Sequence, residues 1–351
     1  MYFYRDSFQS LVLNRIASYT ILSVLLFLSN FTDGQAVFSD SSLLEVKLEF
    51  GIQQVFTDIS ENPTYHKGFL SYEDNSGATI SIPVEIRTRG IFRRKASNCS
   101  QPPLLIKFKP KEISNSVFEG IEKLKMVVPC QKSNIYEQLV LKEYLVYKLY
   151  QIISPYSYRV RLLRLKMVDR YYGNQSISYA FIIEPVEMLA KRLGGVVRDA
   201  KNTHPNACNS YYYKRMAVFQ FMIGQTDWSI KALHNITLIE PEPYAPPIPV
   251  PFDFDFSGFV DSPYALPADH LPIKSVKERH FNGYCKPEPQ YIDAFNYFLS
   301  LNDTISHTIN TFNYLPQKQR NELIKFTGEF FDIIASDTKR KSMIISKCRT
   351  D

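Results

Sequence analysis

The sequence predicts an α+β protein whose first half is rich in strands and whose second half is helical. Up to Ile183 the chain is dominated by runs in which polar and apolar residues alternate, which is typical of half-buried strands. From Tyr211 onward apolar residues recur every three or four positions, which is typical of helices. A cluster of acidic and amide side chains lies just inside the helical half, so we expect a cleft between two lobes.

Composition indicates a folded chain. With 351 residues, 45% of them hydrophobic and 14% aromatic, there is ample material for a packed core. The formal net charge is +6, and no block of lysine and arginine exceeds what a solvated face carries. Nucleic-acid binding is therefore not supported, whereas a preference for anionic ligands is permitted.

The N-terminus has the features of a secretory signal. Basic residues Arg5 and Arg15 precede an apolar run at 21–31, and small residues follow at Gly34 and Ala36. The run is too short for a comfortable membrane span, although an uncleaved membrane anchor is the alternative interpretation. Because no later stretch approaches spanning length, we expect a signal peptide at 1–36 and a mature chain without a membrane span. Such a chain is periplasmic, on the outer surface or secreted.

Export to an oxidising compartment changes how the five cysteines are interpreted. None has the C-x-x-C spacing of a zinc cluster. The simplest arrangement of five cysteines is two disulfides and one free thiol. We expect Cys99 to pair with Cys130 and Cys208 with Cys285, which leaves Cys348 unpaired.

Residues 37–185 form the predicted β-rich lobe, in which one helix interrupts the strands. The expected strands are Leu43–Phe50, His66–Tyr72, Ala78–Arg87, Pro102–Lys109, Arg161–Asp169 and Ser176–Ile183. The turn-rich residues 73–77 join the second and third strands as a hairpin. Apolar residues at helical spacing from Asn134 to Ile152 predict the helix. Residues 186–351 form the helical lobe, with helices expected at 211–223, 291–301, 304–312 and 317–336.

Arginines surround Gly90 at the end of the third strand: Arg87, Arg89, Arg93 and Arg94. A guanidinium group can bind phosphate oxygens in bidentate fashion, so this turn is a candidate phosphate site. A basic surface loop explains the same residues, and both interpretations stay open.

The next strand carries two lysines, Lys107 and Lys109, on the face opposite its apolar residues. Either lysine can reach a nucleotide phosphate, although most strand lysines only face water. In the helix that follows, Glu143 lies beside the apolar stripe and not far out on the solvent face.

The strongest candidate site lies in the segment 221–259. Asp227, Asn235, Asp253 and Asp255 supply oxygen atoms there, and Mg²⁺ prefers one or two carboxylates with amide, water or phosphate oxygens. An Asx-rich turn beside an aromatic strand is the alternative interpretation.

An antiparallel hairpin of 235–240 and 248–256 would bring these groups together. Asn235 then lies opposite Asp253, with Cβ atoms roughly 4.5–5.5 Å apart, close enough to share one cation. Strand alternation puts the two aspartates on one face and the phenylalanines between them on the other. The prolines of the second strand cannot donate to a ladder, so this strand must lie at an edge or be only partly paired.

These residues resemble the spore-coat protein H (CotH) family of atypical, protein-kinase-like proteins, in particular its exported bacterial members. The resemblance rests on RTRGIFRR at 87–94, FMIGQTDW at 221–228 and DFDFSG at 253–258, and it extends from about Val84 to Cys285. The family implies a two-lobed protein-kinase-like fold with a β-rich N-lobe and a helical C-lobe. It also implies transfer of the γ-phosphoryl group of ATP to a protein hydroxyl, with Mg²⁺ or Mn²⁺.

The resemblance assigns roles around the reacting group. Asp227 is expected to be the catalytic residue that orients the acceptor hydroxyl. Asn235 and Asp253 are expected to hold the metal ion, with Asp255 as a further ligand.

For the nucleotide, the resemblance assigns Lys107 to the phosphates, paired with Glu143 from the helix. The same role shifts to Lys109 if the assignment slips by two residues. The turn at Arg89 and Gly90, with Arg93 beside it, is expected to cover the phosphates in place of a glycine-rich loop. Residues 183–186 are expected to lie beside the adenine.

Alternative functions stay open. The first is a secreted phosphotransferase that acts on a protein acceptor in the envelope or outside the cell. The second is a catalytically silent module for envelope binding or assembly, favoured by the scarcity of ATP outside the cytosol and by the eight-residue step from Asp227 to Asn235. The third is metal-assisted phosphoester hydrolysis with His234, but two-metal sites require more ligands than the sequence offers. A structural hydrogen bond is the simpler interpretation of His234.

Overall fold

The computed structural model describes residues 36–350, apart from the side chains of residues 288 and 290. Apart from its last residue, the predicted signal peptide falls on residues 1–35, outside the described part of the chain. Across residues 36–350 no helix is both long enough and apolar enough to cross a bilayer.

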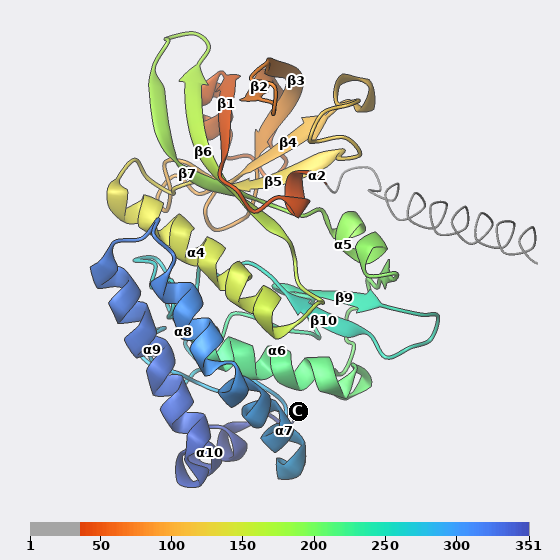
Figure 1. Cartoon of the computed structure of the whole chain (residues 1–351), viewed down its shortest axis with the longest axis vertical. Coiled ribbons are helices and arrows are strands. Elements are labelled where there is room, and N and C mark those ends of the chain that lie inside the picture. Colours follow the sequence, from red (N-terminus) through yellow and green to blue (C-terminus); the bar gives the residue numbers. More distant parts are fainter. Residues whose placement is uncertain (1–35, 351) are drawn as a thin grey trace, which may run out of the picture.

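Seven strands close into a barrel, seen at the top of Figure 1. Around the barrel the order is β1, β2, β3, β4, β5, β7 and β6, and β6 returns to β1. All neighbours are antiparallel except β1 and β6, which pair in parallel with Leu44 opposite Leu163. The strands are β1 (Leu44–Phe50), β2 (His66–Glu73), β3 (Thr79–Thr88), β4 (Leu104–Phe108), β5 (Lys123–Val127), β6 (Val160–Asp169) and β7 (Gln175–Ile183).

Alternation along the strands builds the core of the barrel. In β3, for example, Ile82, Val84 and Ile86 are buried while the residues between them are more exposed. Apolar side chains of the other strands join them in one buried cluster. The six predicted strands are confirmed to within two residues at each end, whereas β5 was not predicted.

The prediction of a two-lobed protein-kinase-like fold with a β-sheet N-lobe is wrong. The parallel pairing of β1 with β6 closes the sheet on itself, so these strands form a mixed barrel and not the open sheet of a lobe. Inward and outward residues alternate along the strands of a barrel as they do in a half-buried open sheet. The sequence pattern is therefore the same for both architectures.

The larger helices lie below the barrel in Figure 1. Helix α4 runs between the two regions and contacts β6 and β7 on one side and α6 and α8 on the other. Its buried residues belong to a second core cluster that it shares with the helical region. The five long helices were predicted to within three residues at each end. The helices are α2 (Ala36–Ser39), α3 (Ile52–Thr57), α4 (Asn134–Ile153), α5 (Val186–Arg192), α6 (Ser210–Ile223), α7 (Glu288–Ser300), α8 (Asn302–Asn310), α9 (Gln317–Ala335) and α10 (Asp337–Met343).

A small sheet beside α6 has the order β10, β9, β8. It consists of β8 (Val196–Val197), β9 (Ile236–Glu240) and β10 (Ile248–Pro251). Strand β10, which contains Pro249 and Pro251, lies at its edge, as expected for residues that lack a backbone N–H.

Two disulfides link the described cysteines. The predicted pair Cys99–Cys130 is confirmed, but the second pair is Cys285–Cys348, and the predicted pairing of Cys208 with Cys285 is wrong. Cys208 is a buried free thiol, and burial raises its pKa to about 11. Two disulfides are typical of an extracellular or periplasmic protein.

Candidate functional site

The loop that carries Asp227 begins where α6 ends. Gly224 takes the left-handed conformation (φ 66°) that caps the helix, and its N–H bonds to the carbonyl of Phe221. A Cβ at this position would lie 2.9 Å from the carbonyl oxygen of Val276, so a larger residue is excluded on two grounds. The chain can therefore turn sharply and present Asp227 directly after the helix.

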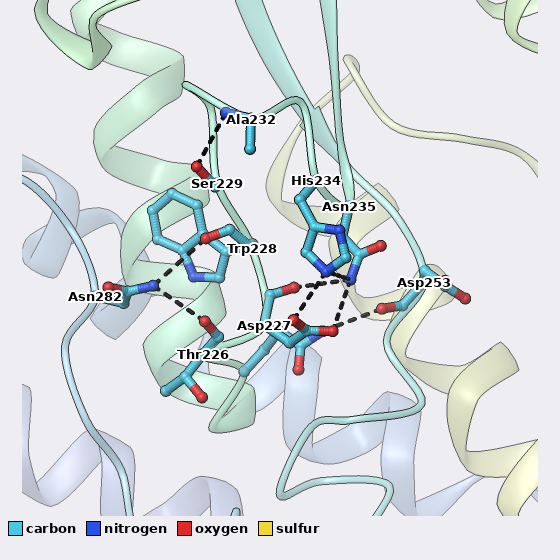
Figure 2. Close-up of polar contacts among 10 residues, drawn as sticks. Thr226, Asp227, Trp228, Ser229, Ala232, His234, Asn235, Asp253 and Asn282 are labelled. Atoms are coloured by element: carbon cyan, nitrogen blue, oxygen red, sulfur yellow. Dashed lines mark hydrogen bonds and ion pairs between the residues drawn. The ribbon is translucent and has the colours of Figure 1, made fainter. Parts of the chain in front are cut away.

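Two neighbouring side chains hold the Asp227 carboxylate (Figure 2). Nε2 of His234 is 2.9 Å from Oδ1 of Asp227. Nδ2 of Asn235 donates to Oδ2 of Asp227 over 3.2 Å and to its carbonyl oxygen over 2.8 Å. The hydrogen bond to Asp227 raises the pKa of His234, which favours a charged imidazolium beside the carboxylate. The structure thus brings Asp227 and Asn235 together.

The backbone at this site is held in uncommon conformations. Leu233, Asn235 and Asp253 have φ values of 50°, 53° and 63°, in the left-handed region that non-glycine residues seldom occupy. Such residues cost of order 1–3 kcal/mol each and tend to cluster at functional sites. Three of the seven described non-glycine residues with positive φ therefore lie at two of the predicted metal ligands and beside them.

The predicted hairpin forms, but its register is shifted by one residue. Ile236 pairs with Pro251, and the N–H of Phe252 bonds to the carbonyl of Asn235 over 3.0 Å. Asn235 therefore lies opposite Phe252, and the predicted pairing with Asp253 is wrong. The side chains of opposed residues share a face, so a shift of one residue changes which groups meet.

Asp253 and Asp255 do not share a strand face, because β10 ends at Pro251. The backbone of Asp253 is fixed instead: its N–H donates to Oη of Tyr147 (2.9 Å), and its carbonyl accepts from Nε2 of Gln225 (3.1 Å). The Asp253 carboxylate is turned away from Asp227 in Figure 2. Its charge nevertheless contributes to the raised pKa of His234.

A second, buried group of charges surrounds Glu143, which is only 2% exposed. It lines a cavity of about 10 Å³ together with Arg93, Asp255 and Tyr264. The Tyr264 hydroxyl donates to Asp255 over 2.9 Å, and Arg93 donates to the carbonyl of Val128 over 2.6 Å. Oε1 of Glu143 has no hydrogen-bond partner among the described residues.

Negative charge is in excess in this buried group. Burial, followed by repulsion from Asp255 and Asp253, raises the pKa of Glu143 well above its usual range. Burial and the charge of Asp253 raise the pKa of Asp255 to about 7. The charge of Arg93 opposes the rise in both pKa values more than any other charge does.

The predicted pairing of Lys107 with Glu143 is wrong. Lys107 lies opposite Glu85 in the β3–β4 ladder and forms a salt bridge with it at 3.4 Å. The lysine close to this region is instead Lys125, on β5. Its pKa responds to the charge of Asp253 and to that of Arg89, which lies in the predicted phosphate-binding turn. Sequence reasoning missed Lys125 because β5 itself was not predicted.

Replacing Lys125 by methionine should stabilise the protein in neutral solution. Burial, reinforced by the charge of Arg89, lowers the Lys125 pKa from 10.5 to about 8. Below pH 8 Lys125 is charged in the folded state, and the burial of this cation lowers the free energy of unfolding. Between pH 8 and 10.5 the unfolded state binds more protons, so the stability of the native protein rises with pH.

Urea unfolding of Lys125→Met should therefore give a free energy of unfolding about 2–3 kcal/mol above the native value at pH 7, and the difference should shrink towards pH 10. Lys107→Met, at a more exposed strand lysine paired with Glu85, serves as the control and should show little change. A difference for Lys125→Met that does not depend on pH would contradict this prediction.

An open cavity of about 470 Å³ adjoins Asp227. Its volume lies within the range of small-ligand and peptide-side-chain sites. Asp227 is 43% exposed and is the only carboxylate in its described lining. Arg349 and Asn282 also line the cavity, and sequence reasoning missed both because no local motif marks them.

The donor set near Asn235 fits a hard divalent cation. Both hydrogen bonds of the Asn235 amide to Asp227 use its nitrogen, which leaves the amide oxygen available. The two hydrogen bonds of Asp253 use its backbone. Oε1 of Glu143, in the buried cavity beside Asp255, is a further oxygen without a hydrogen-bond partner among the described residues.

No group of three or more histidine, cysteine, aspartate or glutamate side chains among residues 36–350 is placed to hold a metal ion unaided. Asn235, Asp253 and Asp255 stay predicted ligands of a metal ion.

No known family model matches the chain, and no curated protein matches it.

Proposed function

We propose that the protein is an exported phosphotransferase that moves the γ-phosphoryl group of ATP to a hydroxyl group of a protein, with Mg²⁺ or Mn²⁺. The observation that carries this proposal is the Asp227 carboxylate. It faces an open cavity and is oriented from two sides by His234 and Asn235. The three sequence segments that resemble the CotH family favour the same reaction.

Asp227 has the properties of a group that orients an acceptor. Its carboxylate can accept a further hydrogen bond from a serine, threonine or tyrosine hydroxyl in the cavity. The hydroxyl oxygen then forms its bond to the γ-phosphorus while the bond to ADP breaks, and Asp227 accepts the hydroxyl proton. The His234 hydrogen bond fixes the carboxylate during this exchange.

The nucleotide belongs on the side of Asp253, away from the open cavity. Asn235, Asp253 and Asp255 would hold the metal ion, which when bound neutralises phosphate charge. The positive charges of Arg89 and Lys125 act on the same region and suit the phosphate groups.

Metal-dependent binding of ATP is the direct test. A ligand at one hundred times its Kd stabilises the folded protein by about 2.7 kcal/mol, which corresponds to a rise in Tm of roughly 5 °C. We expect this rise with ATP plus Mg²⁺ or Mn²⁺, and not with ATP plus a chelator. Asp253→Asn, which keeps the side-chain shape, should lose most of it. An unchanged Tm with ATP and either metal would reject the proposal.

A second candidate is a catalytically silent module for envelope binding or assembly. One observation favours it: the Asp253 carboxylate is turned away from Asp227, so the two groups do not converge. This candidate predicts that no labelled phosphate moves from ATP to a protein acceptor, even where the nucleotide binds. Transfer that is lost in Asp227→Asn would exclude it.

A further inference from the structure

Two cations lie against Tyr284 beside the open cavity. The guanidinium of Arg349 is 4.9 Å from the centre of the Tyr284 ring, and Nζ of Lys231 is 5.4 Å from it. Neither cation forms a salt bridge within the described part of the chain. Arg349 lines the cavity that contains Asp227, whereas Lys231 does not. An arginine without an acidic partner on a cavity wall is suited to bind an anion.

The chain holds Arg349 in this position by three covalent or backbone links. The disulfide Cys285–Cys348 fixes the preceding residue. The N–H of Arg349 bonds to the carbonyl of Gly283 over 2.8 Å, and its carbonyl accepts from the N–H of Cys285 over 2.7 Å. The backbone of Arg349 is therefore anchored on both sides at the point where this residue lines the cavity.

Asn282 connects Arg349 to the loop of Asp227. Its Oδ1 accepts from Nη1 of Arg349 over 3.5 Å. Its Nδ2 donates to the carbonyls of Thr226 (3.0 Å) and Trp228 (3.5 Å), the two residues that flank Asp227 (Figure 2). The side-chain amide of Asn282 thus links Arg349 to the residues on both sides of Asp227, which we assign to the acceptor hydroxyl.

We propose that Arg349 forms an anion subsite that selects acidic acceptors. It binds a carboxylate or phosphate group of the acceptor protein, close in sequence to the hydroxyl that Asp227 orients. This inference rests on the proposed function for the identity of the ligand, but the subsite itself rests on the geometry of Arg349 and Asn282.

The charges of the cavity favour an anion on this wall. Asp227 is the only acidic side chain in the described lining, and His234 already pairs with it. The other ionisable side chains of the lining are Arg349 and His270, both basic. Among the described residues of the lining, an anion bound at Arg349 therefore meets a guanidinium fork and no unpaired carboxylate.

Trp228 provides a reporter that does not depend on catalysis. It is the only tryptophan of the chain, and it lines the same cavity. Its fluorescence can be titrated with two serine peptides that differ only in whether glutamate or glutamine flanks the serine. We expect the glutamate peptide to bind at least tenfold more tightly, and added salt to reduce that preference.

Arg349→Gln should abolish the preference for the glutamate peptide, and Arg349→Lys should retain part of it. Lys231→Gln is the matched control, because it removes the other cation on Tyr284, outside the cavity lining, and should leave the preference intact. Arg349→Glu should reverse the preference towards a peptide with lysine at the same positions. Equal binding of both peptides by the native protein, or an unchanged preference in Arg349→Gln, would overturn the inference.

Labelled-ATP transfer to the same peptides separates this inference from the proposed function. Peptide preference in fluorescence without transfer to either peptide would leave the anion subsite standing and reject the phosphotransferase. Transfer to both peptides at equal rates would support the phosphotransferase and reject the anion subsite.

Discussion

Replacing Asp227 by asparagine should reduce phosphoryl transfer by about 10²–10⁴-fold, the range expected when a group that accepts the acceptor proton is lost. The variant keeps the size of the side chain but lacks a negative charge, so it can no longer take the proton. ATP binding should change little, because the nucleotide is assigned to the side of Asp253. The measurement is labelled transfer to an acceptor, with Tm recorded in parallel.

Asp261→Asn is a matched control for this experiment. The Asp261 carboxylate is 39% exposed, close to the value for Asp227, and it forms a salt bridge with Lys277. Its φ of 57° is one that asparagine tolerates. Transfer by the control should stay within about twofold of the native rate, as expected for a carboxylate that does not take part in the reaction. Equal rates for the native protein and Asp227→Asn would remove Asp227 from the chemistry.

Phe254→Ala should lower the free energy of unfolding by about 3–5 kcal/mol, the usual cost of deleting a fully buried aromatic side chain. Phe254 is fully buried, with its ring centre 4.8 Å from that of Tyr147 and 6.0 Å from that of Phe219. Tyr147 also accepts the hydrogen bond from the N–H of Asp253. Loss of the ring should therefore loosen the predicted metal ligand as well as the core.

Denaturant unfolding of Phe254→Ala and Phe252→Ala tests this second prediction. Phe252 is only half-buried, against Tyr158 at 5.8 Å, so its removal should cost about 1 kcal/mol. The ATP-dependent rise in Tm should also be smaller in Phe254→Ala. Comparable losses of unfolding free energy in the two variants would show that the burial of Phe254 does not determine the loss.

Local sequence patterns predicted most of the secondary structure, because alternation and helical spacing are properties of each segment alone. β5 was not predicted, since Lys123–Val127 is only five residues long. The closure of the barrel was not predicted either. It depends on the parallel pairing of β1 with β6, made by backbone hydrogen bonds between segments far apart in the sequence.

The contact between Asp227 and Asn235 was predicted better than the register of the hairpin. Asp227 and Asn235 were expected together, and they meet through a hydrogen bond. The register between Asn235 and Asp253 could not be predicted, because loop length fixes register and a proline-rich connector has no standard turn. Arg349 lies more than a hundred residues after Asp227 in the sequence, and only the folded chain places it on the same cavity wall.

The arrangement of strands also bears on how the protein behaves at high concentration. The barrel is closed, and at one border of the small sheet β10 carries Pro249 and Pro251, which cannot donate backbone hydrogen bonds to a neighbouring molecule. At the opposite border β8 has only two residues. The described strands therefore offer few free backbone groups to which a strand of another molecule could pair, and we expect the folded chain to resist aggregation by that route.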